Sequence, residues 1–130
     1  APHCHSYQKV KNVLNNESKG IYQGKIFVKN IAQKTDAYQL SRALLLNDTA
    51  EFDAKPELEI YADDVKCSHG STSGSIDLNS VHYLKSRGIP EKEAYQMLVN
   101  GFLSEILEKL SKGKLKNFLI EKLESQINGH

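Results

Sequence analysis

The side chains with the clearest chemical potential are Cys67 and His69, which lie two positions apart in the segment LEIYADDVKCSHGSTSG. In a strand, residues i and i+2 lie on one side about 6.6 Å apart, so a thiolate and an imidazole would approach one point if the chain bends at Gly70. This pair suits zinc, iron or an iron–sulfur species, but a tetrahedral site needs further ligands from elsewhere. A half-buried cysteine beside a hydrogen-bonded histidine is the alternative that spacing leaves open.

Two other groups of reactive residues carry weaker signals. His3, Cys4 and His5 have metal-binding chemistry, but they lie at the start of the chain, where fraying is expected. Asp63 and Asp64 are adjacent, and adjacent residues of a strand face opposite ways. We therefore interpret the two aspartates as part of a turn in which side chains cap backbone groups.

Recognised catalytic and nucleotide-binding motifs are missing from the sequence. The stretch HGSTSGS lacks the lysine and the following helix of a phosphate loop. There is no Gly-x-Ser-x-Gly, His-Glu-x-x-His or Walker motif. The sequence therefore gives no positive case for a stand-alone enzyme.

The composition is that of a globular domain. The chain has 130 residues, of which 39% are hydrophobic and 25% charged, and its net charge of +1 gives no footprint for nucleic acid or an anionic membrane. Two cysteines in unrelated contexts indicate a reducing compartment, and no apolar run is long enough to span a bilayer. We expect a cytoplasmic protein, and its start at Ala1 instead of methionine indicates a processed form or a piece of something longer.

The first part of the chain predicts strands. Apolar runs at 26–28, 44–46 and 58–61 recur after roughly 14 to 18 residues and are separated by turn residues. This recurrence is typical of the stacked turns of a solenoid or of a meander, and it does not distinguish the two. In either case we expect the run after Cys67 to end in a glycine-rich turn.

The remainder of the chain predicts helices. Asp77 or Asn79 can cap a short helix that runs through Ser86, and Gly88 can end it in the left-handed conformation. A long helix from Pro90 to Ser111 follows, with an apolar stripe wider than one packed face requires. That stripe comprises Ala94, Tyr95, Leu98, Val99, Phe102, Leu103, Ile106, Leu107 and Leu110. A last, narrower stripe comprises Leu115, Phe118, Leu119, Leu123 and Ile127. The wide stripe predicts either packing against the β part or a docking face for a partner.

Longer segments resemble a known family. They are QKTDAYQ from Gln33, LLLNDTAEFDAKPELEIYADDVKCSHGSTSGSID from Leu44, YLKSRGI from Tyr83, and Gly101-Phe102 with Glu105 after it. Together they are similar to the C-terminal part of the SufB/SufD family of the SUF iron–sulfur cluster assembly system. The KPELEIYADDVKCSHG segment is closer to the SufD branch than to the SufB branch. Family members are much longer, so the resemblance implies that this chain is a C-terminal fragment.

The resemblance implies a fold and a function. The fold is mainly β with α: residues 1–76 would be the last turns of a right-handed parallel β-helix, and residues 77–130 a small helical domain. The function is that of a non-catalytic scaffold, which pairs with a SufB-type paralogue and binds a SufC-type ATPase. A transient iron–sulfur cluster is expected on the assembled complex and none on the isolated fragment, which could form a homodimer.

The resemblance also implies roles for particular residues. His69 would lie at the interface with the paralogue, with Cys67 beside it, and any metal held by His69 would be shared with the partner subunit. Phe102 and Leu103 are expected to contact the ATPase. Ser71 stands where the family usually has alanine. The alternatives are a small independent metal-binding protein or a purely structural interaction module.

Overall fold

Five parallel-paired strands of ten residues each make up the first part of the chain. The computed structural model describes residues 1–110 and 112–128 and divides the chain into two units, Ala1–Ser75 and Ile76–His130. The strands of the first unit are β1 (His5–Leu14), β2 (Lys19–Val28), β3 (Asp36–Leu45), β4 (Glu51–Ile60) and β5 (Lys66–Ser75). The apolar runs predicted from the sequence fall in β2, β3 and β4.

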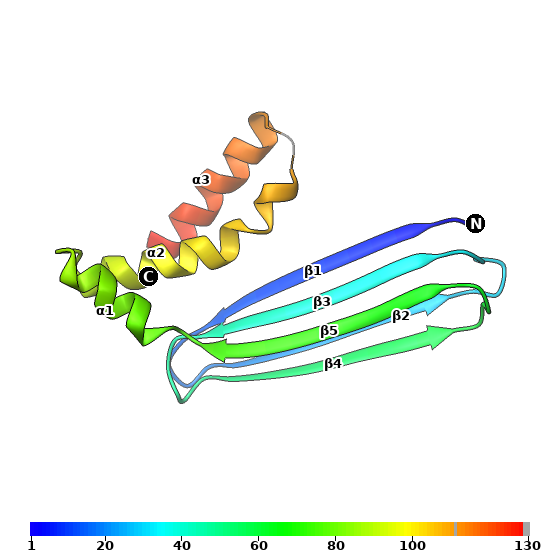
Figure 1. Cartoon of the computed structure of the whole chain (residues 1–130), viewed down its shortest axis with the longest axis horizontal. Helices are drawn as coiled ribbons and strands as arrows, with labels where there is room; N and C mark the ends of the chain where they lie inside the picture. The colour runs from blue at the N-terminus through cyan, green and yellow to red at the C-terminus, as the bar shows by residue number, and fades with distance from the viewer. Residues whose placement is uncertain (111, 129–130) are drawn as a thin grey trace. The chain divides into compact units, whose positions relative to one another are not determined.

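The strands alternate between two sheets. β1, β3 and β5 form one sheet in that order, and β2 and β4 form the other (Figure 1). The chain thus runs along one sheet, turns, returns along the other and begins again beside its own previous strand. We call one strand of each sheet with its two turns a rung. His5 pairs with Asp36 and Asp36 with Lys66, without any slip along the ten residues.

The turns between the sheets also stack on one another. The Asn16 N–H donates to Asn47 Oδ1 at 2.8 Å, and Thr49 Oγ1 donates to the Asn16 carbonyl at 2.8 Å. At the opposite turns, the Asp64 N–H donates to Gln33 Oε1 at 3.0 Å. These hydrogen bonds pair backbone N–H and C=O groups of the turns, which have no partner in the hydrogen-bond ladders of the sheets. The interpretation of Asp63 and Asp64 as a turn is therefore confirmed.

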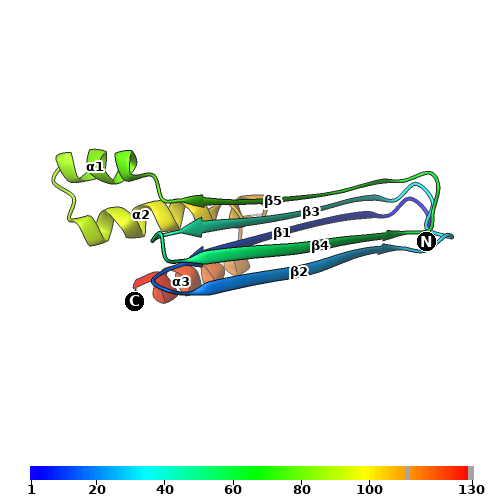
Figure 2. The ribbon, with the colours of Figure 1, turned by 90° about the horizontal axis from the view of Figure 1, so that it is seen from below.

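The strands of the two sheets run along one another (Figure 2). The inner faces, which lie between the sheets, differ in polarity. Burial alternates along β3, and the register extends the same inner face to β1 and β5. The inner face of the β1-β3-β5 sheet is mainly polar: Ser6, Gln8, Val10, Asn12, Leu14, Ala37, Gln39, Ser41, Ala43, Leu45, Cys67, His69, Ser71, Ser73 and Ser75. The other sheet presents mainly apolar residues: Tyr22, Ile26, Val28, Phe52, Ala54, Pro56, Leu58 and Ile60.

Salt bridges from Lys19 and Lys25 tie β2 to β4 on the outer face of their sheet. Lys19 Nζ lies 2.9 Å from Glu51 Oε2, and Lys25 Nζ lies 2.9 Å from Glu59 Oε2. The hydrogen bond from Lys25 holds the pKa of Glu59 below its ordinary value, and the hydrogen bond from Tyr61 acts in the same direction. These pairs are exposed, so they favour the observed register more than they add to stability.

The prediction that the segment after Cys67 ends in a glycine-rich turn is wrong. All of KCSHGSTSGS forms strand β5, including Gly70 and Gly74. The physical reason is that β3 offers a complete row of backbone partners, which outweighs the low strand propensity of serine and glycine. Gly70 has a specific place in this strand, since a Cβ there would lie 3.2 Å from Tyr38 Oη and 3.3 Å from Leu40 Cδ1.

The second unit begins with a capped helix. α1 (Leu78–Ser86) starts at Asp77, whose carboxylate accepts from the Asn79 N–H at 3.0 Å and from the Ser80 hydroxyl. Those two bonds, that of Ser80 above all, hold the pKa of Asp77 below its ordinary value. Gly88, at φ +87°, follows the helix. The predicted limits of this helix are confirmed.

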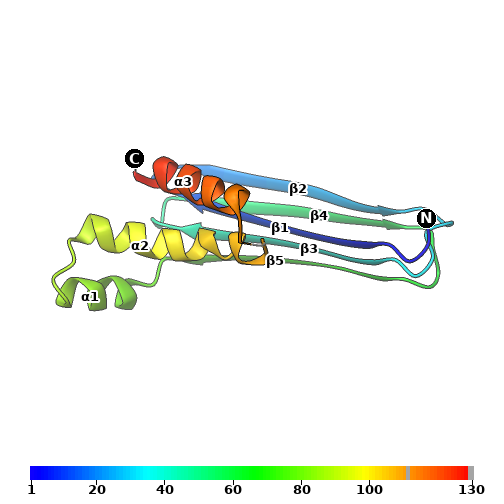
Figure 3. The same cartoon turned by 90° about the horizontal axis from the view of Figure 1, so that it is seen from above.

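The predicted long helix ends earlier than expected. α2 (Glu91–Ser104) stops at Glu105, and a short 3-10 helix, η1 (Leu107–Lys109), follows. Hydrogen bonds there tighten to a three-residue spacing, as from the Ile106 N–H to the Leu103 carbonyl. Gly101 weakens the last turn of the helix, and the tighter turns let α3 (Lys114–Asn128) pack against α2 (Figure 3). Ser111, the predicted end, lies outside the described residues.

The stripe predicted for the last helix divides between two faces. Leu119 and Leu123 are half-buried, as is Ile120, whereas Leu115 and Phe118 are exposed. The side chain of Ile127 lies outside what the structure describes. The core of this unit is formed by Val81 of α1 with Ala94 and Val99 of α2.

We predict that Gly24→Ala destabilises the protein by about 1–3 kcal/mol, the usual cost of overpacking a filled interior. A Cβ at Gly24 would lie 2.5 Å from Gln39 Nε2 and 2.6 Å from Tyr22 Oη. Equilibrium unfolding in urea measures the loss. Gly74→Ala is the matched control, because a Cβ there would meet nothing within 4 Å. Equal stability of the two variants would contradict the close packing of Gly24.

Candidate functional site

Cys67 and His69 lie on the inner face of β5, the edge strand of its sheet. The register places Cys67 beside Ala37 and His69 beside Gln39. Both side chains therefore lie on the same face, as their spacing predicts, but no bend at Gly70 brings them together because the strand continues to Ser75. Cys67 is a free, half-buried thiol, and His69 is exposed.

A complete metal site is not assembled around this pair. Across residues 1–110 and 112–128, no group of three or more histidine, cysteine, aspartate or glutamate side chains is placed to hold an ion. His3, Cys4 and His5 do not converge either: Cys4 Sγ donates to the Ala1 carbonyl at 3.1 Å, and His5 Nδ1 lies 4.0 Å from Asp36 Oδ2. Any metal at His69 would therefore need ligands from another molecule.

The last rung leaves inward-facing side chains uncovered. Leu58 is 40% exposed and Ile60 37%, although their register partners Ile26 and Val28 in β2 are more buried. In the described chain no further strand pairs with β4 or β5, so both also present unpaired backbone groups. We call the edges of β4 and β5, with the inner residues Leu58, Ile60, Cys67 and His69, the open end. The open end has the properties of a strand-pairing surface.

Behind His69 lies a row of polar residues that sequence reasoning did not single out. Gln39 Nε2 donates to Gln8 Oε1 at 2.9 Å, and Gln39 is only 2% exposed. Gln8, Gln39 and His69 occupy successive strands in register. The dipeptide Tyr-Gln does not mark this row in the sequence, because it occurs at Tyr7, Tyr22, Tyr38 and Tyr95 alike.

This interior contains polar atoms without a partner. In the part of the chain that the structure describes, the buried side-chain atoms that lack a hydrogen bond are Asn12 Nδ2, Gln39 Oε1, Ser41 Oγ and Asn100 Oδ1. Three of the four belong to the inner face of the β1-β3-β5 sheet. Buried polar atoms are usually paired, so this concentration marks the polar inner face as unusual.

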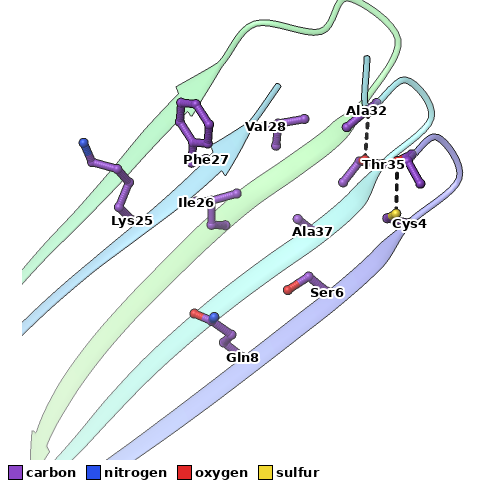
Figure 4. A pocket seen from close by; sticks show the side chains of 11 residues that line it. Cys4, Ser6, Gln8, Lys25, Ile26, Phe27, Val28, Ala32, Thr35 and Ala37 are labelled. Atoms are coloured by element: carbon purple, nitrogen blue, oxygen red, sulfur yellow. Dashed lines mark hydrogen bonds between the residues drawn. The ribbon is translucent and has the colours of Figure 1, made fainter. Parts of the chain in front are cut away.

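A cavity of about 430 Å³ opens at the other edge of the first unit. It lies between the start of β1, the end of β2 and the turn into β3, and Gln8 and Ser6 line it together with Ile26 and Val28 (Figure 4). Thr35 Oγ1 donates to the Ala32 carbonyl at 2.8 Å within its wall. The lining is mixed, and its one thiol, that of Cys4, already bonds a carbonyl. The cavity therefore offers no catalytic arrangement.

The two apolar residues predicted as partner contacts are less exposed than other apolar side chains of the helical unit. Phe102 and Leu103 are half-buried. Met97 of α2 is 51% exposed, and Leu115 and Phe118 of α3 are 65% and 53% exposed. None of the helices in the described chain combines the length and apolarity that crossing a membrane requires.

Comparison with known proteins gives a family match over most of the chain. Residues 1–102 match the family model described as "SUF system FeS cluster assembly, SufBD core domain". The matched residues contain all five strands, α1 and most of α2. They therefore include both Cys67 and His69.

Several curated relatives match the chain. It is 40% identical to the "Iron-sulfur cluster assembly protein SufD" of Escherichia coli (strain K12) over 126 residues, which cover 97% of this chain and 30% of the relative. It is 34% identical to the protein of the same name from Bacillus subtilis (strain 168), over 88% of this chain and 26% of that relative. It is 36% identical to "Protein ABCI7, chloroplastic" of Arabidopsis thaliana, over 81% of this chain and 22% of that relative. The chain thus spans less than a third of the length of these relatives.

Proposed function

We propose, because this chain belongs to the SufBD core family of the SUF iron–sulfur cluster assembly system, that it forms part of a non-catalytic scaffold on which a transient cluster is built. The resemblance predicted from the sequence is confirmed at the level of the family and of its SufD members. The observation that carries the proposal is the open end, where Cys67 and His69 lie on an uncovered inner face.

We further propose that the two sheets are the last rungs of a right-handed parallel β-helix. The alternation of strands between the sheets and the unslipped parallel register support this assignment. The hand follows from the strong preference of parallel crossover connections for a right-handed path. Longer relatives would supply preceding rungs, which would stack on β1 and β2.

In this proposal a SufB-type paralogue covers the open end. Pairing of strand edges supplies backbone hydrogen bonds, and burial of Leu58 and Ile60 supplies apolar contact. His69 then faces the partner, and a cysteine of that subunit supplies the soft thiolate that iron–sulfur chemistry requires. Among the described residues no group of three metal-binding side chains includes His69, which favours this shared site over an independent metal-binding protein.

We expect His69→Ala in the full-length natural protein to impair cluster assembly while leaving folding and binding of the SufC-type ATPase intact. The imidazole of His69 is exposed, so its loss should remove a ligand without leaving a cavity in the fold. Cys67→Ala should have a milder effect, because a half-buried thiol is also explained by packing. Iron and sulfide content of the assembled complex measures the effect.

The control for His69 is Thr72→Ala, which alters an exposed side chain on the opposite face of the same strand. It should assemble clusters like the wild type. Wild-type assembly by His69→Ala would refute the assignment of this residue.

We also propose that the helical unit binds a SufC-type ATPase. The support is the apolar surface of α2 and α3, in which Phe102 and Leu103 are half-buried and Met97, Leu115 and Phe118 are exposed. Exposed large apolar side chains of this kind are typical anchors of an interface. Burying one of them contributes roughly 1.5–3 kcal/mol.

Phe118→Glu should therefore weaken binding of the ATPase by roughly tenfold to a hundredfold. Because Phe118 is 53% exposed, the variant should stay folded, as circular dichroism would verify. The matched control is Tyr83→Glu, which changes a 56% exposed aromatic residue of α1. Undiminished ATPase binding by folded Phe118→Glu would place the interface elsewhere, and an equal loss with Tyr83→Glu would show that the effect is not specific to α3.

The open end should also cause self-association when no paralogue is present. We expect light scattering to detect a homodimer or larger oligomer, because exposed strand edges and apolar inner residues pair readily. Leu58→Glu should reduce it, whereas Ile21→Glu, on the outer face and 62% exposed, should not. A strictly monomeric wild-type protein at high concentration would contradict the expectation.

A further inference from the structure

We propose that Gln39 is a positioning residue for His69: its unpaired carbonyl oxygen accepts a hydrogen from the imidazole and thereby selects which ring nitrogen is free to bind a metal. This inference rests on the proposed function of His69. It concerns a residue in the interior, one strand behind the open end.

The register brings the two residues together. Gln39 and His69 are paired positions of adjacent parallel strands, so they lie on the same face about 5 Å apart at the backbone. On the opposite side of β3, Gln39 Nε2 donates to Gln8 Oε1 at 2.9 Å. The nitrogen of this amide is thus occupied by Gln8, the oxygen is the atom left for another partner, and β5 is the strand on the other side of β3.

The side-chain carbonyl oxygen of Gln39 lacks a hydrogen-bond donor. Gln39 is 2% exposed, and its Oε1 is buried without a hydrogen-bond partner. Leaving such an acceptor unpaired is unfavourable, and solvent does not reach it. Gly24 of the facing sheet leaves room for this amide, since a Cβ there would lie 2.5 Å from Gln39 Nε2.

His69 is the group best suited to supply the hydrogen. It is exposed on an edge strand, so its ring is not confined by a following strand and can rotate toward Gln39. The other inner residues next to it on β5 are Cys67 and Ser71, which pair with Ala37 and Ser41 instead. The opposite sheet presents apolar residues such as Leu58 at its own last strand.

The chemical consequence follows from the two ring nitrogens. A neutral imidazole has one N–H and one lone pair, and a carbonyl oxygen can bond only the N–H. The nitrogen that faces Gln39 therefore carries the proton, and the other presents its lone pair outward to a metal. Metal-binding histidines commonly have their orientation fixed by an acceptor of this kind.

The test is the ratio of the two imidazole tautomers of His69. It is measured by ring ¹⁵N shifts in the full-length natural protein, at a pH where the ring is neutral, with the signals assigned by their loss in His69→Ala. Gln39→Met keeps the volume but removes the acceptor, and it should shift the ratio about fivefold, equivalent to one hydrogen bond of about 1 kcal/mol. Gln39→Glu returns an acceptor and should restore the wild-type ratio.

Ser41→Ala is the matched control, since Ser41 is equally buried and unpaired but lies beside Ser71. It should leave the ratio unchanged. If Gln39→Met does not fold, Gln8→Met provides the second variant, because it frees the Gln39 amide to turn its nitrogen to His69 and should shift the ratio in the same direction. An unchanged ratio in the folded variants, or an equal shift with Ser41→Ala, would overturn the proposal.

The tautomer ratio is read without a cluster, so it separates this inference from the proposed function. Wild-type cluster assembly by His69→Ala would remove the function of His69 and leave the contact with Gln39 to be judged by the ratio alone. Conversely, impaired assembly by His69→Ala together with an unmoved ratio in Gln39→Met would keep the function and reject the positioning role.

Discussion

The unslipped parallel register of the strands is the constraint on which the rest of the first unit depends. Because side chains alternate between the two faces of a strand, a slip of one residue would turn every inner side chain outward. The register instead lines up Gln8, Gln39 and His69, and separately Ala37 and Cys67. Stacked turns at both ends, such as that of Asn16 on Asn47, reinforce the same alignment. Each residue of β5 therefore lies beside the residue of β3 that comes 30 positions earlier in the sequence.

The same register concentrates polar residues in an interior where they are costly. An unpaired buried acceptor or donor typically costs about 1–3 kcal/mol, and Gln39 Oε1 and Ser41 Oγ are both in this condition. An apolar face would stabilise the unit more, as the inner face of the β2-β4 sheet illustrates with Ile26 and Val28. Proteins tend to depart from favourable packing at functional sites. On this inner face, His69 is the last residue of the row that begins with Gln8 and Gln39. The free-energy cost of the unpaired polar atoms is therefore found next to the residue with the clearest chemical potential.

The sequence predicted those features that depend on local chemistry. The cap at Asp77, the stop at Gly88 and the turn at Asp63 follow from residues within one turn of each other. Strand β5 could not be predicted in this way, because its residues have low strand propensity and it forms on the backbone of β3. The end of α2 at Ser104 likewise depends on the packing of α3 against α2. The spacing of apolar residues along α2 gives no information about that packing. Cys67 and His69 were identified by residue type, whereas Gln39 became visible only through the pairing of strands.

The position of His69 on an edge strand follows from what a shared site requires. A residue in the middle of the sheet would have neighbours on both sides and no route to a second protein, whereas β5 is paired on one side alone in the described chain. Such an edge risks indiscriminate pairing, but the residues of β5 are mainly small and polar, and Lys66 adds a charge at its start. Backbone pairing along such a strand is weakly selective, so selectivity must come from the few inner side chains that a partner covers. In the proposed complex, Leu58, Ile60, Cys67 and His69 would be those side chains, which would place the chemistry and the recognition of a partner on the same surface.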